Sequence, residues 1–237
     1  MTMTSSSPFP KDWFGFSETE RHVFFFSGRG PLIEKLYLLL SSNMGSIVLT
    51  GTSGIGKTRI AVEYAYQKRG SYLFGAFFHA HSLEALESDC QSLLRKSNIE
   101  PKPDNNVERV LEFISGRSYP LVIFDNVLNP EVIRRFLSST IPCILTAPNT
   151  IADCINVRID PLGQTDGALL LLRRAGYIRS NEQLEDTMPL VKENARAISL
   201  LLEGIPRRLE NAGKYLADKQ ILVSQCKEGI ENGSLKF

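Results

Sequence analysis

The segment from Gly51 to Thr58 reads Gly-Thr-Ser-Gly-Ile-Gly-Lys-Thr and fits the pattern GxxxxGKS/T in full. Glycines allow positive φ angles, so that backbone N–H groups can come close to an anion. In this pattern the lysine reaches the β- and γ-phosphates of a nucleotide, and the threonine hydroxyl binds Mg²⁺. An apolar strand should precede such a loop and a helix should follow it. The segment therefore predicts a loop that holds phosphates on main-chain amides.

Strand and helix patterns alternate on both sides of this loop. Residues 46–50 are apolar and β-branched, as in a strand buried on both faces of a parallel sheet. After the loop, apolar residues recur at helical spacing from Ile60 to the stop at Gly70. Four more strand candidates are separated by helical segments: residues 72–80, 119–125, 142–146 and 156–159. This alternation predicts an α/β fold of the P-loop NTPase type, with a doubly wound, five-stranded parallel sheet.

Composition shifts divide the chain into three parts. Residues 1–24 are rich in Ser, Thr and Pro, and predict a disordered leader that orders only where Trp13 and Phe14 find a surface. Residues 25–161 form the expected P-loop nucleotide-binding domain. Strand patterns stop after Pro161, and residues 162–237 predict a small helical domain, with helices at about 165–175, 182–203 and 206–217 and a tail after Lys219. Pro189 should interrupt the second of these helices.

The composition excludes several classes of protein. Apolar residues make up 43% and charged residues 22% of the chain, which is typical of a globular protein. The formal net charge is +1, so no strong global field attracts nucleic acid or an anionic membrane, which argues against both partners without excluding a local patch. No apolar stretch approaches the roughly 20 residues that span a bilayer. The four cysteines form no CxxC pair, which favours reduced thiols in a cytoplasmic protein.

A second motif contributes the acid that the chemistry needs. Residues 121–125 are an apolar strand ending in Asp125, about seventy residues after the loop, where a Walker B aspartate would hold Mg²⁺ through water. We therefore expect Lys57 and Asp125 to be the catalytic residues, and Thr58 with Asp125 to be the metal site. The next residue is Asn126, whose amide has no basicity to activate a water. Hydrolysis should be slow unless another acid substitutes.

These motifs also carry a family resemblance over residues 26–216. Four segments occur in the order seen in NB-ARC proteins: Phe26-Ser27-Gly28-Arg29, Asp125-Asn126-Val127, Ile144-Leu145-Thr146-Ala147 and Gly204-Ile205-Pro206. The chain resembles the nucleotide-binding module of a STAND P-loop NTPase, the class that contains NOD-like receptors of innate immunity. The helix after the loop is most similar to the fungal and bacterial branch. Pro148 departs from the family, because members often have a γ-phosphate-sensing arginine there.

The resemblance implies a strand order of 2-3-4-1-5 and an ARC1-like helical domain, with ATP or ADP and Mg²⁺ held between the two domains. It also implies a signal-transduction switch that self-associates or binds a related receptor or effector chain. From the composition and the cysteines, we expect a cytoplasmic protein that binds no nucleic acid and no membrane. Arg29 and the Phe26 region should lie near the base and phosphates, and Pro206 should pack on the adenine. The full set of expected nucleotide-binding residues is Arg29, Gly51, Thr52, Ser53, Gly54, Ile55, Gly56, Lys57, Thr58, Arg59 and Pro206.

Three other functions compete with the switch. One is an active ATP-hydrolysing enzyme whose base comes from Glu63, Asp89 or a neighbouring subunit. A second is a small-molecule kinase, which would need an arginine-rich lid that the sequence lacks. A third is a scaffold without nucleotide, which the complete loop argues against. His79 and His81 alternate at a strand end, and we expect them to satisfy local hydrogen bonds and not to act as bases.

Overall fold

The computed structural model describes residues 9–10, 13–16, 28–42, 45–179 and 181–237. Contacts divide these residues into two compact units. The first, called here the sheet unit, contains the described residues from 9 to 16, from 31 to 51 and from 57 to 159. The second, called here the helical unit, contains residues 160–237 together with residues 28–30 and 52–56. Five residues of the glycine loop therefore cluster with the helical unit.

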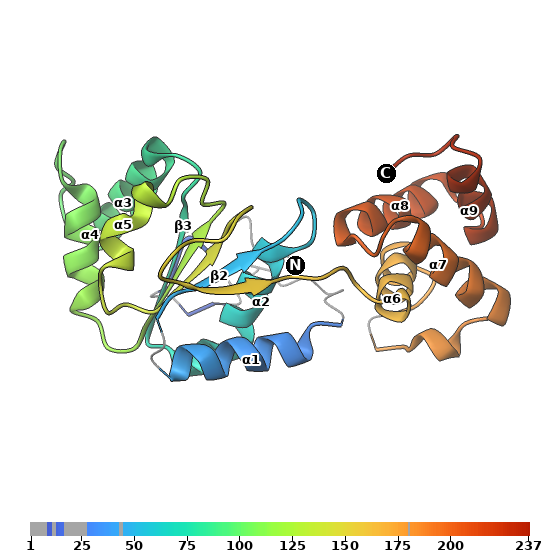
Figure 1. The fold of residues 1–237 in the computed structure, drawn as a ribbon, viewed down its shortest axis with the longest axis horizontal. Helices are drawn as coiled ribbons and strands as arrows, with labels where there is room; N and C mark the ends of the chain where they lie inside the picture. The colour runs from blue at the N-terminus through green and yellow to red at the C-terminus, as the bar shows by residue number, and fades with distance from the viewer. Residues whose placement is uncertain (1–8, 11–12, 17–27, 43–44, 180) are drawn as a thin grey trace, which may run out of the picture. The chain divides into compact units, whose positions relative to one another are not determined.

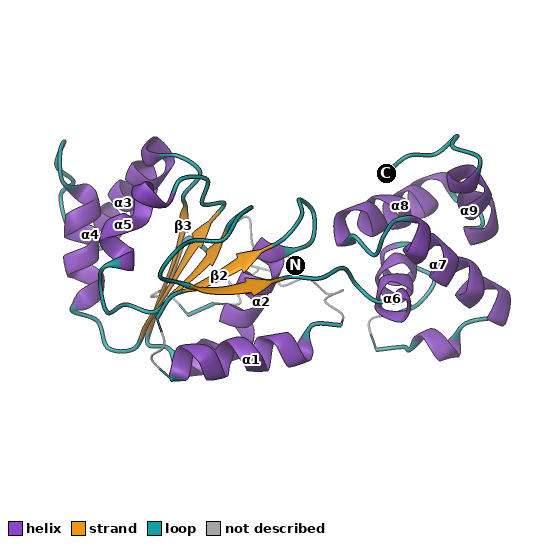
Figure 2. Ribbon diagram, in the orientation of Figure 1, coloured by secondary structure: helices purple, strands orange, loops and turns teal. Residues whose placement is uncertain are grey.

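The sheet unit is built on a fully parallel sheet (Figures 1 and 2). Its six strands lie in the order β1-β3-β4-β5-β2-β6. They are β1 (Trp13–Phe14), β2 (Ile47–Thr50), β3 (Phe74–His79), β4 (Pro120–Asp125), β5 (Cys143–Thr146) and β6 (Ile155–Arg158). Parallel strands place all their carboxyl ends at one edge, so the segments after β2, β3, β4 and β5 meet there.

The expected sheet was wrong in strand count and in strand order. It had five strands in the order 2-3-4-1-5, whereas the observed sheet has six, with β1 at one edge. The difference comes from β1 alone, because the other five strands follow one another as expected. β1 belongs to the stretch expected to be a disordered leader, and Trp13 and Phe14 are both buried there. The rest of that leader lies largely outside the described residues.

Helices cover both faces of the sheet (Figure 1). On one face lie α3 (Leu83–Lys96), α4 (Asn106–Ser115) and the short α5 (Arg134–Leu137), and on the other lie α1 (Gly30–Ser41) and α2 (Lys57–Lys68). Short 3₁₀ turns occur at Arg69–Ser71 and Pro130–Ile133. Such two-sided cover explains why the central strands are apolar throughout instead of alternating.

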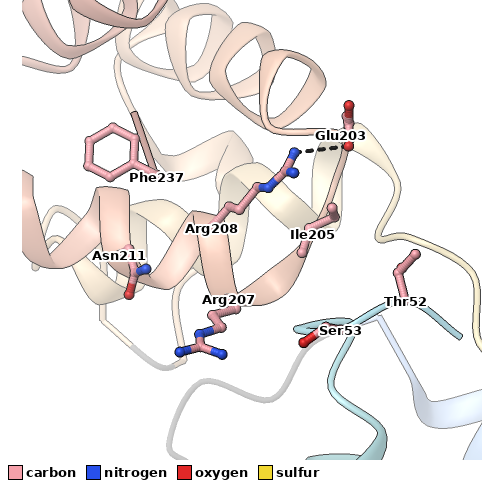
Figure 3. A pocket seen from close by; sticks show the side chains of 8 residues that line it. All are labelled: Thr52, Ser53, Glu203, Ile205, Arg207, Arg208, Asn211 and Phe237. Atoms are coloured by element: carbon pink, nitrogen blue, oxygen red, sulfur yellow. Dashed lines mark hydrogen bonds and ion pairs between the residues drawn. The ribbon is translucent and has the colours of Figure 1, made fainter. Parts of the chain in front are cut away.

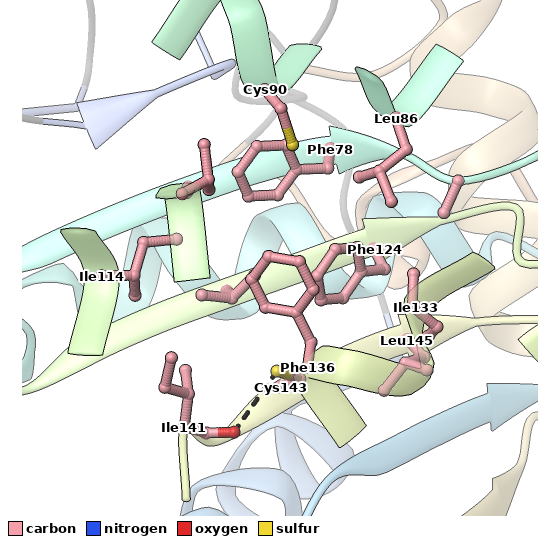
Figure 4. Close-up of a cluster of buried hydrophobic side chains, with 14 of the residues drawn as sticks. Phe78, Leu86, Cys90, Ile114, Phe124, Ile133, Phe136, Ile141, Cys143 and Leu145 are labelled. Carbon is pink, nitrogen blue, oxygen red and sulfur yellow. Dashed lines mark hydrogen bonds between the residues drawn. The ribbon is translucent and has the colours of Figure 1, made fainter. Parts of the chain in front are cut away.

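Aromatic rings fill the layer between the sheet and α3 to α5 (Figure 4). Phe78 and Phe124 stack with ring centroids 5.5 Å apart, and Phe136 packs on Phe124 at 4.9 Å. Cys90 and Cys143 lie in the same layer, and burial raises the pKa of the Cys143 thiol to about 12. These thiols therefore stay protonated and serve in packing. They are not reactive, because only a thiolate is a nucleophile.

The helical unit contains α6 (Gln164–Arg174), a 3₁₀ turn (Leu184–Asp186), α7 (Pro189–Leu201), α8 (Pro206–Lys219) and α9 (Val223–Glu231). The expected helix over 182–203, which Pro189 was expected to interrupt, begins at Pro189 in the structure, because proline is favoured at the first position of a helix. The unit has its own apolar core, which includes Leu171, Ile198 and Leu209. Among the described residues, no helix is both long enough and apolar enough to span a bilayer.

Gly75 of β3 makes room for the edge strand β1. The indole of Trp13 lies directly on Gly75 of β3, so close that a Cβ on Gly75 would overlap its ring carbons. Phe9 and Phe16 flank the same indole, at centroid distances of 5.4 and 5.1 Å. Trp13 is the only tryptophan in the chain, so its fluorescence reports on the docking of β1.

We expect Gly75→Ala to push Trp13 off the sheet and to lower the free energy of unfolding by about 1–3 kcal/mol, as overpacking usually does. The emission of Trp13 should shift to longer wavelength at the same time. Gly70→Ala is the matched control, since a Cβ there meets no atom within 4 Å. An unchanged spectrum and an unchanged urea midpoint for Gly75→Ala would contradict this account of the edge.

Candidate nucleotide-binding site

The glycine loop leaves the carboxyl end of β2 and leads directly into α2. Three of its glycines have positive φ angles, at 141° for Gly51, 81° for Gly54 and 95° for Gly56. Ile55 is buried and donates its backbone N–H to the carbonyl of Thr52 at 3.3 Å, which closes the turn. Because α2 begins at Lys57, the first N–H groups of that helix follow the loop immediately. Such a helix start, with its dipole, favours an anion.

Lys57 lies half-buried at the start of α2. Its Nζ donates to the carbonyl oxygen of Gly51 at 2.7 Å, so the ammonium is held against the loop. Burial lowers the pKa of Lys57 from its usual value, and the negative charge of Asp125 partly opposes that shift. A bound phosphate would stabilise the charged form of Lys57, since it offers the lysine charge-assisted hydrogen bonds.

Two hydroxyl groups converge on one carboxylate oxygen. Oδ1 of Asp125, at the end of β4, accepts a hydrogen bond from Thr58 at 2.6 Å and from Thr146, at the end of β5, at 2.7 Å. Thr146 Oγ1 in turn accepts the backbone N–H of Asn126 at 2.8 Å. Hydroxyl and carboxylate oxygens are the ligands that Mg²⁺ prefers, together with phosphates and waters. The structure thus brings together the two expected metal residues.

Thr146 was not expected as a site residue, although it completes this network. It is buried, with an exposed fraction of 1%, and it links β5 to the end of β4. The signal that could have found it is positional: a hydroxyl residue ends the strand beside the one that ends in Asp125.

Asn126 is exposed and has a left-handed backbone, with φ at 59°. Asparagine adopts this conformation more easily than most residues. Its backbone N–H is held by Thr146, and its amide cannot accept a proton from water. Pro148, two residues beyond Thr146, is exposed. Asn126 is not an acid that could act as a base, and Pro148 is not a cation, although NB-ARC proteins often have such residues at these two positions.

The other expected residues lie in different places. Arg29 is in the helical unit, where its guanidinium donates to the carbonyl of Asp160 at 2.6 Å. Burial lowers the pKa of Arg29, while Asp166 and Asp160 raise it. Arg59 is exposed on the first turn of α2. Phe26 lies outside the described residues.

Pro206 is the first residue of α8, and this helix start packs on the glycine loop. The next backbone N–H, of Arg207, donates to the carbonyl of Gly54 at 3.2 Å. A Cβ on Gly54 would lie 2.9 Å from the Cβ of Arg207, and one on Gly56 would lie 4.0 Å from Pro206. The loop therefore needs glycine here for close approach as well as for its φ angles.

A pocket of about 440 Å³ lies beside this contact (Figure 3). Arg208 forms an ion pair with Glu203 at 2.9 Å, which leaves one net positive charge among the lining side chains. The lining residues are Thr52, Ser53, Glu203, Ile205, Arg207, Arg208, Asn211 and Phe237.

No protein-family model matches the chain. Three curated proteins, two from strains of Mycobacterium tuberculosis and one from Mycobacterium bovis, are each 25% identical over 207 residues; all three are described as uncharacterized proteins. The match covers 82% of this chain and 51% of each relative, so the chain spans about half their length.

Two solved structures share the fold. The replication initiator DnaA, bound to AMPPCP and single-stranded DNA, aligns with a TM-score of 0.50 and 14% identity over 90% of this chain and 66% of its own. PCH-2 of C. elegans aligns with a TM-score of 0.52 and 14% identity over 88% of this chain and 70% of its own. Both are P-loop NTPases. The chain therefore has a P-loop NTPase fold, and at this identity the likeness concerns the fold alone.

Proposed function

We propose that this protein is a nucleotide-controlled switch of the NB-ARC/STAND type, which binds ATP or ADP with Mg²⁺. One observation carries the proposal: the glycine loop is followed by Lys57 and Thr58, and Thr58 already contacts Asp125. Phosphates on the loop would bond to Lys57, and Mg²⁺ would bind Thr58 directly and Asp125 through water. That DnaA was solved with AMPPCP, an ATP analogue, on the same fold is consistent with this assignment.

The contact between the loop and α8 suggests how bound phosphate is sensed. Thr52 to Gly56 and the start of α8 belong to one compact unit, and Gly54 is bonded to Arg207. A phosphate that reorders the loop would therefore act directly on the helix start. In this scheme the bound nucleotide sets the conformation, and hydrolysis is the slow step that resets it.

We also propose that the ATP form is the one that self-associates or binds a related receptor or effector chain. The absence of nucleic acid and membrane from its partners, and a cytoplasmic location, stay predictions from composition. DnaA was solved with single-stranded DNA, and that observation concerns DnaA.

The test is to identify the nucleotide in the purified protein and to measure the binding of ADP and ATP with and without Mg²⁺. We expect a bound nucleotide that resists dialysis and tighter binding in the presence of Mg²⁺. We also expect hydrolysis to be much slower than in an active ATPase. An empty protein with no affinity for either nucleotide would favour a scaffold. Rapid, Mg²⁺-dependent phosphate release would favour an enzyme.

A further inference from the structure

His79 and Asp89 form a side-chain pair at the carboxyl edge of the sheet. The carboxylate of Asp89, on α3, accepts the backbone N–H of His79 at 2.7 Å and lies 2.9 Å from Nδ1 of the same residue through the same oxygen, Oδ2. Leu86 and Cys90 bury α3 on the sheet on either side of Asp89, which fixes the carboxylate in place. Oδ2 of Asp89 thus contacts both the backbone and the imidazole of His79, which fixes the orientation of the ring.

This arrangement determines which ring nitrogen is available. A carboxylate that faces Nδ1 favours the tautomer with the proton on Nδ1, because only an N–H can donate to it. Nε2 then carries the lone pair that can accept a proton. The side chain of His79 is 45% exposed and that of Asp89 is 24% exposed, so part of the imidazole is open to water. A base that is oriented by a carboxylate in this way is a known means of activating a nucleophile.

The pair also lies beside the metal residues. His79 is the register partner of Asp125 across the parallel strands β3 and β4, where neighbouring strands are about 5 Å apart. The backbone N–H of the following residue, Ala80, donates to the carbonyl of Asp125 at 2.8 Å, so the pairing continues past the end of β3. Asp125 in turn contacts Thr58 at the end of the glycine loop. His79 therefore stands one strand away from the carboxylate expected to face Mg²⁺ and the γ-phosphate.

We propose that His79 is the general base for ATP hydrolysis in this protein, with Asp89 as the residue that positions it. The inference rests on the proposed nucleotide site. Nε2 of His79 accepts a proton from a water while the oxygen of that water bonds to the γ-phosphorus. The bond from this phosphorus to the bridging oxygen breaks, and its electron pair leaves with ADP. The proton then passes from the imidazolium to the released phosphate or to solvent.

The structure favours His79 as the base over Asp89 and Glu63, the two acids that the sequence offers for this role. Asp89 acts through the histidine, because the oxygen that accepts from the backbone N–H is also the one that faces the ring. Glu63 is buried on α2, with an exposed fraction of 6%, and it accepts a hydrogen bond from Gln67 at 2.7 Å. Asn126 cannot supply a base. His79 satisfies local hydrogen bonds with Asp89, as expected, and the proposal adds a chemical role to this pair.

The first experiment is single-turnover hydrolysis of Mg·ATP by the full chain and by His79→Gly. A general base contributes about 10²–10⁴-fold, so we expect the rate to fall by at least about 100-fold. Added imidazole should restore part of the rate in His79→Gly, because it can occupy the space of the lost ring. It should restore nothing in Lys57→Ala. The control is His81→Gly, which removes the other histidine of this strand end and should leave the rate unchanged.

The second experiment tests Asp89 without using activity. Ring nitrogen NMR signals of the full chain, which has three histidines, should show the Nδ1–H tautomer for His79. Asp89→Asn should mix the two tautomers, and the hydrolysis rate should fall in the same variant while the affinity for ATP stays the same. An unchanged tautomer, or a mixed tautomer with an unchanged hydrolysis rate, would contradict the positioning role of Asp89.

Binding measurements separate this inference from the proposed function. If the wild-type chain binds no nucleotide, the proposed function fails and this inference fails with it. If it binds ATP with unchanged affinity in His79→Gly, but the variant hydrolyses ATP at the wild-type rate or ignores imidazole, only the inference is overturned. A wild-type protein that binds Mg·ATP and never hydrolyses it overturns the inference as well.

Discussion

Lys57→Ala is expected to lower the affinity for ATP and for ADP by at least about 100-fold. Hydrogen bonds to charged groups contribute about 1.5–3 kcal/mol each, and the lysine of this loop makes more than one to the phosphates. Each 1.4 kcal/mol is a factor of ten in affinity. Isothermal titration with each nucleotide, in the presence of Mg²⁺, measures the change directly.

The fold should survive this substitution. Burial already disfavours the charge on Lys57, so the alanine variant loses the hydrogen bond to Gly51 and the attraction to Asp125, but it also loses a desolvation cost. We therefore expect the midpoint of thermal unfolding to change little without nucleotide. Lys68→Ala is the matched control: it removes a lysine at the other end of α2, where Nζ pairs with Glu34 at 2.7 Å. Equal affinities for Lys57→Ala and the wild type would refute the phosphate role of the loop.

Gly204→Ala is expected to have the largest effect on stability. Gly204 has φ at 63°, and a Cβ there would overlap the carbonyl oxygen of Leu162 and lie 3.1 Å from its nitrogen. The two residues are also bonded, since Leu162 N–H donates to the Gly204 carbonyl at 2.9 Å. The left-handed conformation costs about 1–2 kcal/mol with a side chain. Forcing the two segments apart adds about 1–3 kcal/mol.

Gly176→Ala separates these two costs. Gly176 has φ at 76° in the same unit, but a Cβ there meets no atom within 4 Å. This control should lose only the conformational term, about 1–2 kcal/mol. Chemical denaturation of both variants measures the difference. A loss in Gly204→Ala no larger than in Gly176→Ala would mean that the chain relaxes around Leu162 at no cost. Nucleotide affinity is expected to fall in Gly204→Ala alone, because Gly204 precedes the helix start that packs on Gly54.

The glycine loop and the strand that ends in Asp125 were easier to predict than the complete sheet. The spacing of glycines, Lys57 and Thr58 depends on local backbone geometry, and the strand that ends in Asp125 is apolar over its whole length, so both could be found in the sequence. Strand β1 could not, because two residues flanked by prolines and glycine carry no periodic signal, and its pairing depends on the bare surface of Gly75 far along the chain. The pair of His79 and Asp89 is a tertiary contact between a strand end and the middle of α3.

Helix α1 could have been predicted from the sequence. Ile33, Leu36 and Leu40 lie on its buried face at helical spacing, and Pro31 stands in its first turn. This pattern is present in the sequence between the leader and the glycine loop, although no helix is predicted there above. The sequence around Thr146 carries only the family resemblance, because the role of Thr146 depends on two strands, β4 and β5, that are separated in sequence.

The position of β1 bears on how the protein should be handled. A version trimmed to start near α1 would leave the outer side of β3 with unpaired backbone groups around Gly75 and an apolar hollow where the indole lay. Open edges of this kind recruit strands from other molecules. Such a shortened chain is expected to precipitate or to form intermolecular sheets on storage, even though its phosphate loop is complete.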